Sequence, residues 1–204
     1  YLALSDAEIK SPGFKDTNAD GSIDLTSEVN YGIALNAAKR DLGAVEATDF
    51  TSNIYTAFYA GRKLINDNAG TDNDIQPELI ELRKVILDNW EKVIAATVVH
   101  YINEVLIDMS KFDTNDYSFT GLAKHWSELK GFALGFQFRP DALLSDVDFD
   151  LFHAKVTDAP ILEGASEEAI TAYKADLIAA RTILAEAYSF DAANVGDAEG
   201  NNGW

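Results

Sequence analysis

The 204-residue sequence contains no cysteine, only three histidines and four prolines, and 16 basic residues against 34 acidic ones. Without cysteine, the chain cannot be a small scaffold held by disulfides. The net charge of −18 argues against partners such as nucleic acids and anionic membrane surfaces, because an acidic surface repels phosphate groups. No apolar run reaches the roughly 18 residues of a transmembrane segment. The apolar fraction of 47% argues against disorder and supports a sizeable core.

The start of the sequence bears on whether the chain has been processed. It begins at Tyr1, with neither an initiator methionine nor a signal peptide. We therefore expect a processed or trimmed piece of a longer protein. The absence of cysteine suits an exported protein, which avoids stray oxidation.

Apolar residues recur with a helical period along most of the chain, and no stretch alternates as a strand would. The predicted helices are 28–42, 48–67, 77–110, 117–137, 145–156 and 166–188. Short links at 43–47 and 111–116 favour antiparallel neighbours, so the sequence predicts an all-α, up-down helical bundle. The predicted domains are an N-terminal segment over 1–27, a helical bundle over 28–190 and an extended tail over 191–204.

The N-terminal segment carries a pattern typical of an EF-hand-like calcium loop. Its run DTNADGSID matches the first nine positions of such a loop, with Gly21 at the sharp turn. Hard oxygen ligands at alternating positions are what Ca²⁺ needs to fill six to eight coordination sites. The predicted ligands are Asp16, Asn18, Asp20, Ser22 through its carbonyl, Asp24 and Glu28.

The end of this loop departs from the usual spacing. Position 12, where a bidentate acid is expected, is Ser27, and Glu28 follows one residue later. The entering helix of a true EF-hand is also missing, as in the dockerin type of loop. We still predict that Ca²⁺ binds here and fixes the entry into the helix that begins at 28; the alternative is a polar turn that binds nothing.

A second group of metal-ligating residue types lies on two predicted helices. His125 and Glu128 are three residues apart, and His100 and Glu104 are four apart, so each pair shares a helix face. His100 lies roughly 15 Å from the end of its helix and His125 roughly 12 Å from the start of the next, so an antiparallel hairpin places them level. The four residues are a candidate site for a transition metal such as iron or zinc. The alternative is hydrogen-bonded core histidines.

Three stretches together carry a resemblance to a known family: DTNADGSIDLTSEVNYGIALNAAKRDLG, NWEKVIAATVVHYINEV and HWSELKGFALGFQFRP. Over about 16 to 190, the chain resembles the C-terminal half of domain-of-unknown-function family 4856 of exported bacterial proteins, often lipoproteins. That family is similar to imelysin-like proteins, which include the insulin-cleaving membrane peptidase and periplasmic iron-uptake proteins. The resemblance implies a two-part helical bundle with a His-x-x-Glu signature, here His125 and Glu128. Ala123 departs from the imelysin motif, which has glycine there.

The resemblance further implies that an N-terminal half is missing from this chain and could be a partner as a separate chain. We expect an extracytoplasmic calcium-binding protein, periplasmic, at the cell surface, anchored as an outer-membrane lipoprotein or secreted, with a role in metal or nutrient acquisition. We expect no catalytic activity, because no nucleophile, phosphate-loop or zinc-peptidase motif is present. The alternatives are a metallopeptidase-like enzyme using His125 and Glu128, and a self-associating structural subunit of a surface or extracellular assembly.

Overall fold

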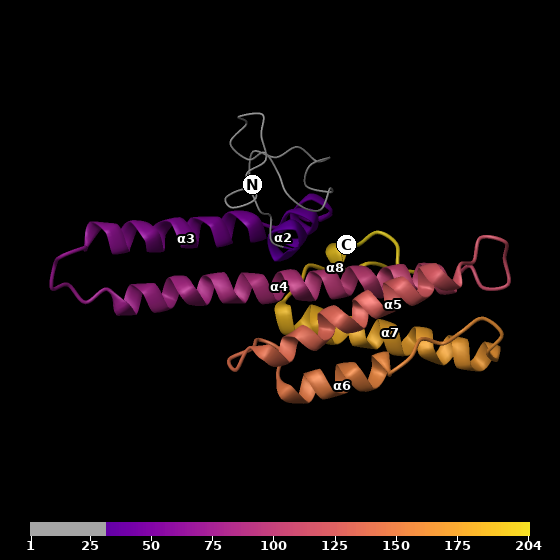
Figure 1. The fold of residues 1–204 in the computed structure, drawn as a ribbon. Coiled ribbons are helices and arrows are strands. Elements are labelled where there is room, and N and C mark those ends of the chain that lie inside the picture. Colours follow the sequence, from indigo (N-terminus) through magenta and orange to yellow (C-terminus); the bar gives the residue numbers. More distant parts are fainter. Residues whose placement is uncertain (1–31) are drawn as a thin grey trace. The chain divides into compact units, whose positions relative to one another are not determined.

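The computed structural model describes residues 32–204, and these residues form helices and connecting loops without a strand (Figure 1). The prediction of an all-α fold is therefore confirmed for the described residues. The α-helices are α2 (Gly32–Leu42), α3 (Phe50–Asp67), α4 (Gln76–Met109), α5 (Phe119–Ala133), α6 (Asp146–Val156), α7 (Glu167–Tyr188) and α8 (Ala192–Val195), and a 3₁₀ helix, η1 (Leu134–Phe138), follows α5. The part of the chain before residue 32, with its predicted helix start at 28, lies outside the described residues.

Serine residues define where three of these helices begin. The hydroxyl oxygens of Ser118, Ser145 and Ser166 each accept a hydrogen bond from a backbone N–H three residues later, so they cap α5, α6 and α7. The predicted helix 117–137 is shorter than expected: α5 ends at Ala133 and the chain tightens into η1. Arg139, with φ −107° and ψ 113°, is extended because it precedes Pro140.

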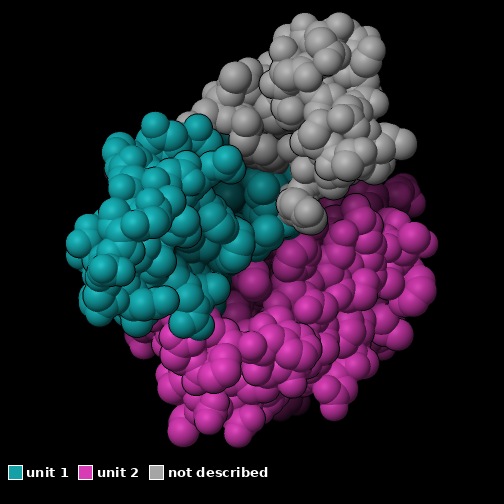
Figure 2. All heavy atoms as spheres, turned by 60° about the vertical axis from the view of Figure 1, so that its left-hand side comes forward, with its two compact units in different colours: residues 1–42, 47–93 teal, residues 43–46, 94–204 magenta. Residues whose placement is uncertain are grey.

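The chain divides into two compact units (Figure 2). The described part of unit 1 comprises residues 32–42 and 47–93, and unit 2 comprises residues 43–46 and 94–204. Helix α4 contributes to both units, since the division falls between Val93 and Ile94.

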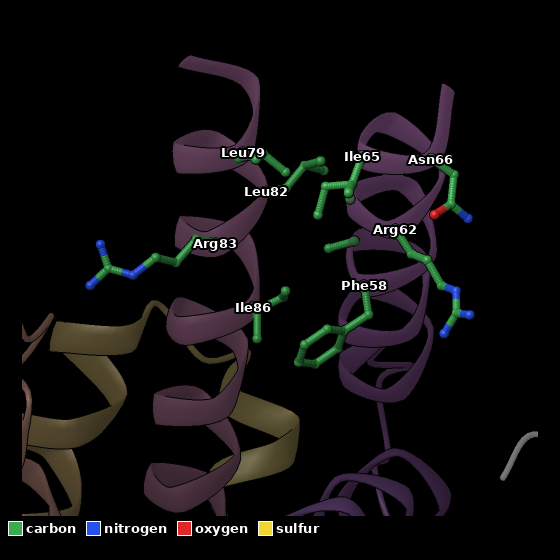
Figure 3. Close-up of a pocket in the computed structure, with 10 residues that line it drawn as sticks. Phe58, Arg62, Ile65, Asn66, Leu79, Leu82, Arg83 and Ile86 are labelled. Carbon is green, nitrogen blue, oxygen red and sulfur yellow. The ribbon is translucent and has the colours of Figure 1, made fainter. Parts of the chain in front are cut away.

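Unit 1 contains α2, α3 and the first half of α4. The carboxylate of Asp41 in α2 accepts hydrogen bonds from the backbone N–H groups of Phe50 and Thr51, so it joins α2 to the start of α3. Further along α3, Gly61 faces Leu79 and Leu82 of α4 (Figure 3), and a Cβ at Gly61 would lie 3.8 Å from both side chains. A small residue at this position thus allows the two long helices to approach.

Unit 2 has a dense core built by α5, α6, α7 and the second half of α4. Fully buried apolar side chains come from all four helices: Ile102, Leu122, Leu129, Phe152 and Leu177. Two successive hydrogen bonds link α5, α7 and α6. The Trp126 indole N–H donates to the Tyr173 hydroxyl over 2.9 Å, and that hydroxyl donates to the Val156 carbonyl over 2.9 Å. Pairing these buried polar groups avoids the cost of leaving them unsatisfied.

The C-terminal segment differs from the prediction of an extended tail. Residues 192–195 form α8, and Trp204 is only 6% exposed, with its ring edge-on to Phe190 at 4.8 Å. The Asn103 side-chain amide of α4 donates to the carbonyls of Val195 and Trp204, at 3.1 and 3.0 Å. Composition alone does not reveal this packing, because the anchoring residue Asn103 lies about a hundred positions earlier in the chain.

A glycine permits that close approach. Gly200 has φ +88°, and a Cβ there would lie 2.5 Å from the Asn103 carbonyl oxygen. Arg181 of α7 completes the arrangement by donating to the Asn103 side-chain oxygen and to the Asp197 carbonyl. The polar, glycine-rich sequence of the tail therefore serves packing against α4 and α7. Among the described helices, none combines the length and the apolar character needed to cross a membrane.

Candidate functional site

The predicted calcium loop cannot be placed in this structure. Its ligands Asp16, Asn18, Asp20, Ser22, Asp24 and Glu28 all lie outside the described residues. The calcium site therefore stays a prediction from the sequence.

The second predicted group is described, and it centres on His125. The imidazole Nδ1 lies 2.7 Å from Oδ2 of Asp108 and 3.9 Å from Oε2 of Glu104. The Lys111 ammonium lies 3.1 Å from the other oxygen of Asp108. We call Glu104, Asp108, Lys111 and His125 the His125 cluster.

Helix geometry explains why these residues meet. Tyr101, Glu104 and Asp108 are three and four residues apart, so they share one face of α4. The short connection from Ser110 to Ser118 brings α5 back along that face, where the Tyr101 and His125 rings stack at 6.3 Å. His125 thus lies against the stretch of α4 from Tyr101 to Asp108. The rotation of α4, which the sequence does not fix, presents Tyr101 and Asp108 to His125.

The other two predicted ligands have different surroundings. His100 lies beside the Tyr101 ring at 4.9 Å, and the Oε2 atom of Glu128 is buried with no hydrogen-bond partner among the described residues. Within residues 32–204, no group of three or more histidine and acidic side chains is arranged to hold a metal ion. The structure therefore brings together Glu104 and His125 of the predicted four, and adds Asp108.

The His125 cluster is built around one buried carboxylate, that of Asp108, and its other members are partly exposed. Asp108 is 6% exposed, and its two oxygens interact with Lys111 on one side and His125 on the other. A cation that bound here would have to compete with the Lys111 ammonium for the same carboxylate. The arrangement stabilises the junction of α4 and α5 while satisfying a carboxylate that is costly to bury alone.

A third histidine, His153 of α6, packs against two aromatic rings. Its ring lies 4.3 Å from that of Phe149 and 5.3 Å from that of Phe152. Both ring nitrogens are buried. Burial and the nearby charge of Lys130 lower the pKa of His153, because both disfavour the imidazolium form.

The two histidine environments differ in what they can do. In the His125 cluster, the carboxylate of Asp108 is paired with Lys111 and His125, whereas burial lowers the pKa of His153 and so favours its neutral form. Neither presents an open set of ligands or a nucleophile beside a base among the described residues. No protein-family model, curated protein or solved structure matches this chain.

Proposed function

We propose that this protein is an exported helical protein that binds Ca²⁺ through Asp16, Asn18, Asp20, Ser22, Asp24 and Glu28. The observation that supports the proposal is the sequence DTNADGSID, in which oxygen ligands alternate around a glycine at the turn position. The ion draws together acidic side chains that would otherwise repel one another. Its role is structural: it fixes the segment that leads into the helical part of the chain.

The wider setting of this proposal rests on the resemblance to family 4856 and to imelysin-like proteins. On that basis, we propose a periplasmic or cell-surface location and a part in metal or nutrient acquisition without catalysis. The described residues offer no observation in favour of a metallopeptidase, since His125 is engaged with Asp108 and Glu128 lies outside that cluster.

Calcium binding is tested by thermal unfolding with calcium and with EGTA. At a calcium concentration one hundred times Kd, mass action adds about 2.7 kcal/mol, which raises Tm by roughly 5–10 °C. Asp20→Ala removes a ligand and should abolish the rise. Asp72→Ala, which changes an exposed loop aspartate between α3 and α4, is the matched control and should retain it. Equal melting of the wild-type protein in calcium and in EGTA would contradict the proposal.

A further inference from the structure

The sequence contains one Asn–Gly dipeptide, Asn202–Gly203, in the C-terminal segment of unit 2. Such a pair is chemically reactive, because glycine has no Cβ to hinder its backbone nitrogen. The Gly203 nitrogen, on losing its proton, forms a bond to Cγ of Asn202 while the bond from Cγ to Nδ2 breaks and ammonia leaves. Water then opens the cyclic succinimide to aspartate or isoaspartate. The asparagine is exposed, so water reaches it.

The fold holds both reacting groups of this dipeptide. The Asn202 side-chain amide donates to Oδ2 of Asp197 over 2.9 Å, and its backbone is left-handed, with φ +61°. The Gly203 backbone packs against another part of the chain, since a Cβ there would lie 2.5 Å from the Gly196 nitrogen. Ring closure requires rotation about the Asn202 backbone and side chain. Contacts on both sides therefore oppose the reaction while they are intact.

Asp197 is the centre of the turn formed by residues 197–202, which we call the Asp197 turn. Its Oδ1 accepts from the backbone N–H groups of Asn201 and Glu199, at 2.8 and 3.0 Å. These hydrogen bonds, led by that from Asn201, hold the pKa of Asp197 below its usual value, so it is a carboxylate at neutral pH. The Asp197 carbonyl accepts from Arg181 over 2.7 Å, which joins the turn to α7. After deamidation, a second carboxylate would face Asp197 in place of an amide donor.

We propose that Asn202 is a site of spontaneous deamidation, which the closed Asp197 turn holds unreactive and which, once converted, keeps the turn from closing again. Opening of the turn frees the side chain and the Gly203 backbone to react. The product replaces a hydrogen bond to Asp197 with repulsion between two carboxylates, next to Trp204, which Asn103 anchors. This inference goes beyond calcium binding and does not depend on the loop at residues 16–28.

The rate of conversion is measured by peptide mapping with mass spectrometry over a time course in mildly alkaline buffer. Folded wild-type protein should deamidate at Asn202 more slowly than the same protein unfolded in urea. Asp197→Ala should speed conversion in the folded protein at least about tenfold, because the turn loses its charge-assisted hydrogen bonds. Glu199→Ala is the matched control: it removes an exposed carboxylate from the same turn, leaves the Asp197 hydrogen bonds in place and should react like wild type.

The effect of conversion is measured by hydrogen exchange over residues 196–204. Asn202→Asp, which copies the aspartate product, should speed exchange there about tenfold, because a hydrogen bond becomes a repulsion. Asn202→Gly removes the amide without adding charge and suits the positive φ, so its exchange should be slower than that of Asn202→Asp.

Four outcomes would overturn the proposal. They are equal rates of conversion in folded and urea-unfolded wild-type protein, Asp197→Ala reacting like wild type, Glu199→Ala reacting as fast as Asp197→Ala, and Asn202→Asp exchanging like wild type. Circular dichroism melts confirm that each variant remains folded, and the comparison of folded and unfolded wild-type protein needs no variant.

Discussion

The described parts of unit 1 and unit 2 are both helical, but most of the completely buried apolar side chains lie in unit 2. In unit 2, Ile102, Leu129 and Leu177 are completely buried. In unit 1, the core residues Ile54 and Ile86 each remain 9% exposed. Moreover, Tyr55, Phe58, Tyr59, Ile65 and Ile80 of unit 1 are each at least half exposed. Helix formation alone therefore does not complete a core; a third and fourth long helix are needed to cover both sides of a helical pair.

The two units also differ in charge. The described part of unit 1 has seven basic and nine acidic residues, whereas unit 2 has seven basic and 19 acidic ones. Most of the described acidic excess therefore belongs to unit 2.

The largest expected difference between the units is in the free energy of unfolding that is lost when a side chain is truncated to alanine. Leu177→Ala in unit 2 removes a completely buried side chain and should lower the free energy of unfolding by about 3 kcal/mol. Ile80→Ala in unit 1 changes a side chain that is 54% exposed and should cost less than about 0.5 kcal/mol. Urea denaturation measures both. Equal losses would show that unit 1 is as well packed as unit 2.

A smaller loss in the free energy of unfolding is expected where the C-terminal segment packs against Asn103 of α4. Asn103→Ala removes the amide that donates to Val195 and Trp204 and the oxygen that accepts from Arg181. The free energy of unfolding should fall by about 2 kcal/mol, because a buried arginine group loses its partner. Hydrogen exchange should accelerate over residues 191–204. Unchanged exchange there would mean that this network does not hold the tail.

The smallest expected effect is a pH dependence of the free energy of unfolding, caused by His153 in unit 2. The pKa of His153 is lowered from its model-compound value of 6.5 in the folded protein, so the unfolded chain binds more protons below that pH. His153 therefore lowers stability as pH falls below about 6.5, and the loss is complete once pH passes below its folded pKa. His153→Phe keeps an aromatic ring among Phe149 and Phe152 and should reduce this loss. Urea denaturation of both proteins at pH 7.5 and pH 5 measures the difference.

Local spacing predicted some residues of the His125 cluster and missed others. The spacing of His100, Glu104, His125 and Glu128 predicted two pairs that each share a helix face, and of these four residues the structure brings Glu104 and His125 together. Asp108 was missed, although it lies four residues after Glu104 on the same face. Which residues of a face meet a partner depends on helix rotation, and rotation is set by packing of the whole core. The exposure of Phe58 and Ile65 was missed for the same reason.

Local sequence signals account for the helical class of the described residues and for most of their helix boundaries. Apolar spacing, serine caps and Pro140 are local signals, and they act within a few residues of the position they control. Only the packing of complete helices brings Asn103 against Trp204 and Asp108 against His125. These features depend on residues that are distant in the chain, and their positions follow from how complete helices pack rather than from any local pattern.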